Sequence, residues 1–126
     1  MNLLFIGLWM MFNHVLDDYA LQGILAQMKQ RAWWEENAPD AMYENDFVAA
    51  LAAHAFSWTF MIMLPVTYVA ELNIGLSFIL AFCVNMFIHA IVDDMKANKK
   101  RINLVTDQAI HLAQIFVTWY LIPFLI

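Results

Sequence analysis

The stretch LNIGLSFILAFCVNMFIHAIV, residues 72–92, contains no Asp, Glu, Lys or Arg and no proline. Its length is close to the roughly 20 apolar residues that cross a bilayer as an α-helix. Three other apolar stretches have a similar character: Asn2–Leu16, Phe47–Ala70 and Leu104–Ile126. The sequence therefore predicts an integral membrane protein with four spans.

The composition supports this interpretation. The chain has 126 residues, of which 63% are hydrophobic and 13% are charged, and its length indicates one domain, residues 1–126. A soluble domain of this size has too much surface to hide so many apolar side chains. Barrel strands are excluded, because the apolar residues run continuously and do not alternate. The alternative is a soluble all-helical protein that oligomerises through apolar faces.

The first apolar stretch is short, but a helix that continues to about residue 20 would lengthen it. No basic segment and no small-residue cleavage site accompany it, so we expect a retained membrane anchor. The next stretch, ALQGILAQMKQRAWWEEN at residues 20–37, has apolar residues at helical spacing followed by two tryptophans. This pattern predicts an amphipathic helix that either extends the first span or lies in the membrane interface.

The predicted fold is therefore all-α, a four-helix transmembrane bundle with a helical extension or interfacial helix after the first span. The spans cover about residues 2–20, 47–70, 72–92 and 104–126. The loops at about 21–46 and 93–103 contain all six Lys and Arg residues. The positive-inside rule assigns these loops to the cytoplasm, so both termini are expected outside.

Each predicted span contains one of the four histidines, and three of these have an aspartate four residues away. Residues at positions i and i+4 share one face of a helix, so each pair presents an imidazole and a carboxylate together. Because the helix direction alternates, we expect these residues in one inward-facing layer near the cytoplasmic end. The layer consists of His14, Asp18, His54, His89, Asp93, Asp107 and His111.

Such a layer is typical of a metal site. An aspartate at the centre of a span costs about 2.5–3.5 kcal/mol, and such groups persist when they face the bundle interior and satisfy one another. Imidazole nitrogen and carboxylate oxygen suit Zn, Mn, Fe or Mg, and these seven residues offer enough donors for two ions. Some aspartates could instead hold the imidazoles in one tautomer. The alternatives are a metal-free polar network or proton relay, and unrelated pairs at the surface.

Other polar residues near this layer have simpler expected roles. Asp17 and Asp94 point about 100° away from the pairs and are expected on a solvated cytoplasmic face. Lys96 lies three residues after Asp93 and could bind an anionic substrate group or reach lipid head groups. The run KANKKR, residues 96–101, favours head-group contact, so no nucleic-acid partner is expected.

Four short motifs carry a family resemblance: HVLDDYALQ (14–22), the isolated His54, HAIVDDMK (89–96) and DQAIH (107–111). In this order they resemble an uncharacterised bacterial and phage membrane family, domain of unknown function 3307. The family pattern is H-x3-D-[FY]-x-L-Q, a His in the second span, H-x3-D-x2-K and D-Q-x2-H. The resemblance covers nearly the whole chain and implies a multi-pass protein of the bacterial inner (cytoplasmic) membrane. It implies no activity, because none is established for the family.

The favoured functional hypothesis is a membrane-embedded, metal-dependent hydrolase. Its substrate would be a phosphate- or ester-containing membrane lipid or lipid-like molecule at the cytoplasmic leaflet, with Asp93 and Lys96 as catalytic residues. No serine or threonine adjoins a histidine in motif spacing, and Cys83 is distant, so water is the expected nucleophile. The alternative is a non-enzymatic protein whose cluster is structural or carries cations or protons, and which acts through a protein partner or as a homodimer.

Overall fold

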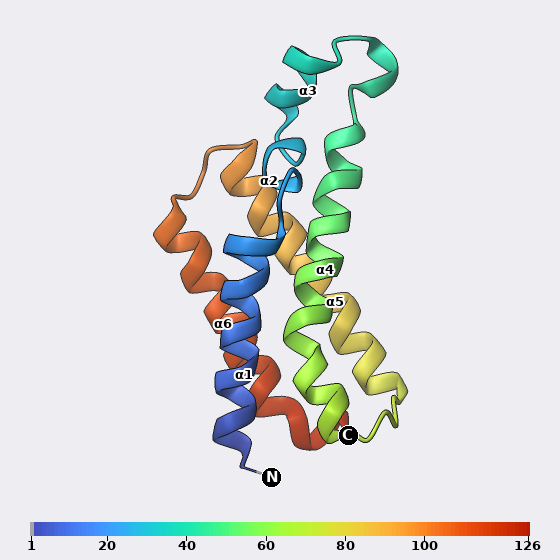
Figure 1. The fold of residues 1–126 in the computed structure, drawn as a ribbon, viewed down its shortest axis with the longest axis vertical. Coiled ribbons are helices and arrows are strands. Elements are labelled where there is room, and N and C mark those ends of the chain that lie inside the picture. The colour runs from blue at the N-terminus through green and yellow to red at the C-terminus, as the bar shows by residue number, and fades with distance from the viewer. Residues whose placement is uncertain (1) are drawn as a thin grey trace.

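The computed structural model describes residues 2–126, and every regular element within that range is helical. Four long helices run alternately up and down the molecule (Figure 1). They are α1 (Leu3–Val15), α4 (Asp46–Val69), α5 (Leu76–Ala97) and α6 (Leu104–Leu125). The predicted all-α fold is confirmed.

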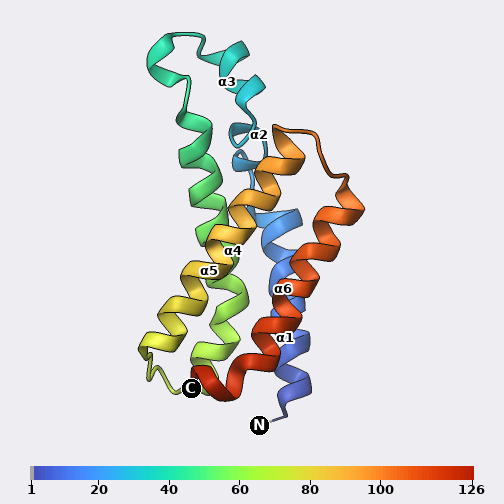
Figure 2. The same cartoon turned by 180° about the vertical axis from the view of Figure 1, so that it is seen from behind.

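The four long helices form a ring in which each packs against two neighbours. Helix α1 contacts α4 and α6, and α5 contacts the same two helices from the other side. The C-terminus and the α4–α5 loop lie at one end, whereas the α5–α6 loop lies at the other (Figures 1 and 2). All six Lys and Arg residues belong to segments at this second end, which we refer to as the loop end.

Three segments are long and apolar enough to cross a membrane: Ala41–Val69, Leu76–Ala97 and Leu104–Leu125. Helix α1 has 13 residues, a length of about 20 Å, whereas the hydrocarbon core of a bilayer is about 30 Å thick. The helical path continues beyond Val15 as a π-helical segment, η1 (Leu16–Leu21), where the sequence predicts a continuation. The structure thus shows three candidate spans, and the fourth stays a prediction.

The segment between η1 and α4 is helical but broken, whereas the sequence predicts one amphipathic helix over residues 20–37. It forms α2 (Leu25–Met28) and α3 (Arg31–Asn37), followed by the 3₁₀ turn η2 (Ala41–Tyr43). Gly23 separates η1 from α2 with a φ of +53°. This left-handed conformation costs glycine nothing sterically, so the chain changes direction there. Helix α2 then packs back against α4.

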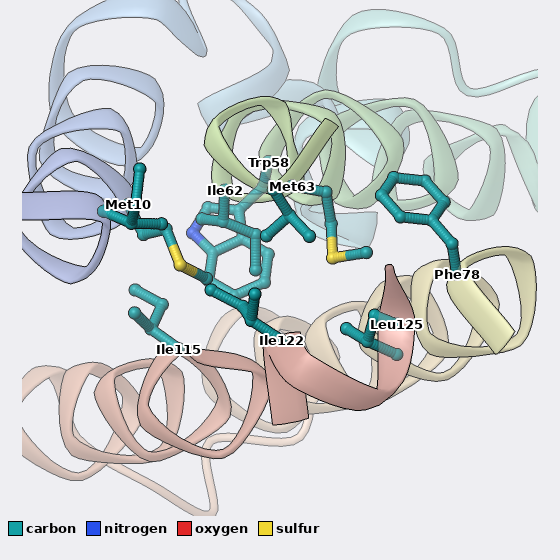
Figure 3. Packing of buried hydrophobic residues seen from close by; sticks show 10 residues of the cluster. Met10, Trp58, Ile62, Met63, Phe78, Ile115, Ile122 and Leu125 are labelled. Atoms are coloured by element: carbon teal, nitrogen blue, oxygen red, sulfur yellow. The ribbon is translucent and has the colours of Figure 1, made fainter. Parts of the chain in front are cut away.

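The end of the bundle opposite the loop end is filled by apolar side chains (Figure 3). Helix α4 supplies the largest of them, Trp58, which is completely buried. The other members of this core come from α1, α4, α5 and α6: Ile6, Met10, Ile62, Met63, Val66, Phe78, Ile115, Ile122 and Leu125. This apolar core closes the bundle on the side away from the loops.

The outer faces of the bundle are apolar as well. Phe12, Phe87 and Phe116 are each more than 60% exposed, and many other large apolar side chains join them. Soluble monomers rarely expose contiguous apolar surface of this extent. An apolar exterior around a buried polar layer is the arrangement expected when lipid, rather than water, surrounds the helices.

Candidate metal centre

The structure buries all seven residues of the predicted layer between the four long helices. Their side chains come from α1 and η1, from α4, from α5 and from α6, and each residue is at most 5% exposed. They are His14, Asp18, His54, His89, Asp93, Asp107 and His111. The i and i+4 pairs on α5 and α6 therefore face inward together, because both members of each pair lie on one side of a regular helix.

One half of the cluster is centred on the His54 ring. Its Nε2 atom lies 3.2 Å from Asp18 Oδ1 and 3.2 Å from His89 Nε2. Asp93 Oδ2 is 3.3 Å from the same nitrogen. Two imidazoles and two carboxylates, contributed by α4, α5 and η1, thus converge on one point.

The other half is centred on the His111 ring. Its Nε2 atom lies 3.4 Å from Asp93 Oδ1 and 3.4 Å from Asp107 Oδ1. These three atoms are buried and have no hydrogen-bond partner within residues 2–126. Buried polar atoms are nearly always paired, so three adjacent exceptions point to a cation or a proton shared among them.

The hydrogen bond at the other ring nitrogen of His111, Nδ1, determines the tautomer of the ring. The Gln114 side-chain amide donates to the backbone carbonyl of Asn85 at 3.1 Å. The Gln114 oxygen is therefore left to accept a hydrogen bond from His111 Nδ1, at 3.2 Å. With the proton on Nδ1, the Nε2 lone pair of a neutral His111 faces Asp93 and Asp107, as a metal-binding imidazole requires.

The spacing of the donor atoms fits an ion better than it fits direct hydrogen bonds. Ligands arranged tetrahedrally about 2.0–2.2 Å from an ion lie about 3.3–3.6 Å from one another. A hydrogen bond between charged partners would draw the atoms to about 2.7–2.9 Å. Four of the six His–Asp separations, at 3.2 to 3.4 Å, are close to the first pattern, and the other two are 3.9 Å. The Lys29–Asp93 ion pair in the same cluster is 2.6 Å long.

Three overlapping groups of donors can hold an ion, with the atoms of each group within 4.8 Å of one another. They are Asp18–His54–His89, His89–Asp93–His111 and Asp18–Asp107–His111. A neutral imidazole has one free ring nitrogen, whereas the two oxygens of a carboxylate can bind separate ions. The first and third groups share only the Asp18 carboxylate. By their ligands alone, they are the one pair of these groups that do not compete for the same imidazole nitrogen.

His14 lies beside these groups and belongs to none of the three. Its Nδ1 atom accepts a hydrogen bond from Trp58 Nε1 at 2.8 Å, so its Nε2–H donates to Gln108 Oε1 at 3.1 Å. Gln108 Nε2 in turn donates to Oδ2 of Asp18 and of Asp107, at 2.8 and 3.0 Å. His14 thereby orients Gln108. Because Gln108 binds the Oδ2 atoms of Asp18 and Asp107, the Oδ1 atoms of both carboxylates face the histidines. The predicted role of His14 as a direct ligand stays a prediction.

Replacing Gln108 by Leu is expected to weaken divalent-metal affinity by about 10–100-fold, the usual cost of losing a group that orients a ligand. The affinity is measured by competition with a chromophoric chelator on detergent-purified protein. Gln27→Leu, at an exposed position of α2, is the matched control and should leave the affinity unchanged. Equal affinities for the two variants would contradict this role of Gln108.

The prediction for Asp17 is wrong, because the residue is buried rather than solvated. It is 1% exposed, and its Oδ1 accepts a hydrogen bond from Ser57 Oγ at 2.6 Å. The cause is the π-helical geometry of η1, whose wider turns bring consecutive side chains closer in direction than an α-helix does. Asp17 Oδ2 lies 3.9 Å from His54 Nδ1, on the side of the ring opposite Asp18.

Asp94 is partly exposed and pairs with Lys99, consistent with its predicted surface position.

Lys29 is also a member of the cluster, although the sequence predicts it only as part of a basic loop. The residue is 4% exposed, and its Nζ lies 2.6 Å from Asp93 Oδ2 and 3.0 Å from Gln22 Oε1. A signal was present in the sequence, because Lys29 falls four residues after Leu25 on the apolar face of the amphipathic pattern. Lys96, the predicted anion-binding residue, contacts Asp107 Oδ2 at 2.6 Å.

Comparisons of this chain with protein-family models, with curated proteins and with solved structures found no match. The resemblance to domain of unknown function 3307 therefore stays a prediction. The chemistry of the buried cluster is the basis for inferring function. That cluster is a set of buried imidazole and carboxylate donors that can bind a metal ion.

Proposed function

We propose that this chain is a membrane protein that holds a divalent metal ion in its buried His/Asp cluster. The observation that carries the proposal is the group of unpaired buried atoms: His111 Nε2 with Asp93 Oδ1 and Asp107 Oδ1 on either side. A cation among these donors would remove the cost of leaving them unpaired. The mixed nitrogen and oxygen donors suit Zn, Mn or Fe, and Mg is a further candidate through the carboxylates.

The charge of the cluster supports a divalent ion. Four carboxylates lie buried in or beside it, and two lysines form ion pairs with them. The carboxylates belong to Asp17, Asp18, Asp93 and Asp107, and the lysines are Lys29 and Lys96. With neutral imidazoles, four negative charges against two positive charges leave two uncompensated. One divalent cation neutralises them, and uncompensated charge in a protein interior is strongly unfavourable.

Elemental analysis tests the proposal directly. Protein purified in detergent, freed of loosely bound metal by gel filtration, is expected to retain at least about one divalent ion per chain. Incubation with a strong chelator should remove the ion and lower the midpoint of thermal unfolding, because an ion that binds only the folded state stabilises it. A proton relay or a metal-free polar network predicts no metal and no effect of the chelator.

The proposed topology places the cluster near the cytoplasmic leaflet. It includes α1 with η1 as a fourth span, and all six Lys and Arg residues lie at the loop end. By the positive-inside rule that end is cytoplasmic, with both termini on the other side. The family resemblance supports the bacterial inner membrane as the location, in a bacterial or a phage-encoded protein.

We further propose that the metal centre serves a hydrolase that acts on a phosphate- or ester-containing, lipid-like substrate. A divalent ion lowers the pKa of water toward about 7 and polarises a phosphoryl or ester oxygen. In this proposal Asp93 orients the reacting groups, while Lys96, one-quarter exposed at the loop end, neutralises the substrate anion. The position of the cluster near the basic loops supports a substrate with an anionic head group.

The near-complete burial of the cluster favours a second candidate, a structural metal site in a protein that acts through partners. Each of the seven predicted residues is at most 5% exposed, so a lipid-like substrate would need the bundle to open. Transport across the bundle is less well supported. Ile62, Ile115 and Ile122 fill much of the interior on the far side of the cluster. The buried Thr118 hydroxyl is already hydrogen-bonded to Asn85 and to the Gln114 carbonyl.

A further inference from the structure

Lys29 is held inside the cluster by the chain on both sides of it. Asn98, just beyond α5, accepts a hydrogen bond from the Arg31 backbone N–H at 2.7 Å and donates to the Lys29 carbonyl at 3.0 Å. Gln22 accepts from the Lys29 ammonium and also donates to the Asp18 backbone carbonyl. These contacts fix the side chain in the interior. Without such contacts, a lysine side chain usually extends so that its ammonium group reaches water.

The Lys29 ammonium forms an ion pair with Asp93 Oδ2, a carboxylate oxygen that lies between the two halves of the metal centre. Asp93 Oδ1 faces His111 Nε2 at 3.4 Å. Asp93 Oδ2 lies 3.3 Å from His54 Nε2 and 3.9 Å from His89 Nε2. The Asp93 carboxylate therefore has the position of a bridge between two ions, but Lys29 already contacts Oδ2 at 2.6 Å.

An ion that used Asp93 Oδ2 would share this single oxygen with the ammonium. With a metal–oxygen distance of about 2.0–2.2 Å, the ion and Lys29 Nζ would lie within about 5 Å of each other. Two cations at that separation repel strongly in a protein interior, where screening by water is weak. While Lys29 is in place, the His54–His89 half therefore lacks its fourth protein ligand. The His111 half keeps Asp93 Oδ1, Asp107 Oδ1 and the Asp18 carboxylate.

We propose that Lys29 is a built-in cation that takes the place of a second metal ion and limits the centre to one. The inference rests on the proposed metal binding and adds a specific role for a residue outside the His/Asp motifs. The net charge of the cluster also favours one ion. With both lysines present, one divalent ion neutralises the cluster, whereas a second ion would leave two positive charges in excess. Without Lys29, the Asp18–His54–His89 group gains Asp93 Oδ2 as a fourth ligand.

The test is the number of ions per chain in Lys29→Met, which keeps an unbranched apolar stem and removes the charge. Wild-type and variant proteins are stripped with a chelator, reloaded with Zn²⁺ or Mn²⁺, desalted and analysed for metal and protein. We expect about one ion per wild-type chain and about two per Lys29→Met chain. Lys99→Met, which removes a surface lysine paired with Asp94, is the matched control and should bind one ion.

Thermal unfolding provides a second measurement that separates this role from simple packing. Metal-free Lys29→Met should unfold at a lower temperature than the metal-free wild type, because Asp93 loses its partner. Metal should then raise the midpoint of the variant more than that of the wild type. A purely structural lysine would lower both midpoints equally and leave the ion count at one.

The outcomes distinguish the two proposals. No metal in either protein would overturn the proposed metal binding, and with it this role of Lys29. One ion in both proteins, or two in the wild type, would overturn the role of Lys29 and leave metal binding intact. If Lys29→Met does not fold, Lys29→Gln replaces it, and two ions in the wild type would still refute the inference without any variant.

Discussion

Asp93→Asn is expected to reduce divalent-metal affinity by more than the roughly 100-fold lost with a ligand-orienting group, and to destabilise the bundle by about 3–5 kcal/mol. Asp93 is fully buried and faces both halves of the cluster, with Oδ1 near His111 and Oδ2 near His54. Its removal also leaves the Lys29 ammonium buried without its carboxylate. Loss of one partner of a buried ion pair is among the most costly single substitutions.

The measurements for Asp93→Asn are metal competition and thermal or SDS-induced unfolding of the purified protein in detergent. Asp94→Asn, the adjacent residue in the chain, is the control. Its carboxylate is partly exposed and pairs with Lys99, so both metal affinity and stability should stay close to the wild type. Metal affinity that is the same in the two variants would refute the position assigned to Asp93 in the metal centre.

Trp58→Ala should lower the free energy of unfolding by about 3–5 kcal/mol, the range for deleting a large aromatic side chain from a core. Trp58 is completely buried and stacks on the His89 ring, with centroids 4.1 Å apart and planes within 19°. It is also the hydrogen-bond donor to His14. The variant thus loses apolar packing and the support of two histidines together.

Trp58→Phe separates these contributions. The phenyl ring keeps part of the packing but has no N–H, so His14 loses one hydrogen bond, worth about 0.5–1.5 kcal/mol. Stability is followed by far-ultraviolet circular dichroism during thermal unfolding. Trp33→Ala, on the short helix α3 outside the bundle, is the control for loss of a tryptophan and should have a much smaller effect. Equal losses for Trp58→Ala and Trp33→Ala would contradict the central position of Trp58.

The positions of the polar layer could be predicted from sequence because two simple regularities act together. The four-residue spacing of His89 and Asp93 places both side chains on one face of α5, and the same holds for Asp107 and His111 on α6. Alternating helix direction then brings the end of one span beside the start of the next (Figure 2). Neither regularity depends on details of packing, so both survive in the folded protein.

The residues that sequence reasoning missed depend on local departures from a regular α-helix. Asp17 is buried because η1 is π-helical, which the sequence of apolar and polar residues does not indicate. Lys29 reaches the cluster because the chain turns at Gly23 and folds α2 back against α4. The hydrogen bonds of His14 to Trp58 and Gln108 join residues far apart in sequence, and no spacing rule identifies such partners.

The short first helix bears on the order in which the chain is inserted into the bilayer. In the proposed topology, the N-terminal segment carries His14, Asp17 and Asp18, and each aspartate deep in lipid would cost up to about 2.5–3.5 kcal/mol. The groups that satisfy these side chains, among them Ser57 and Gln108, are translated later. By length and composition the three long helices can cross a membrane, whereas in this topology the N-terminal segment would remain at the membrane surface until they are present. Biogenesis of this protein would therefore end, rather than begin, with its first helix.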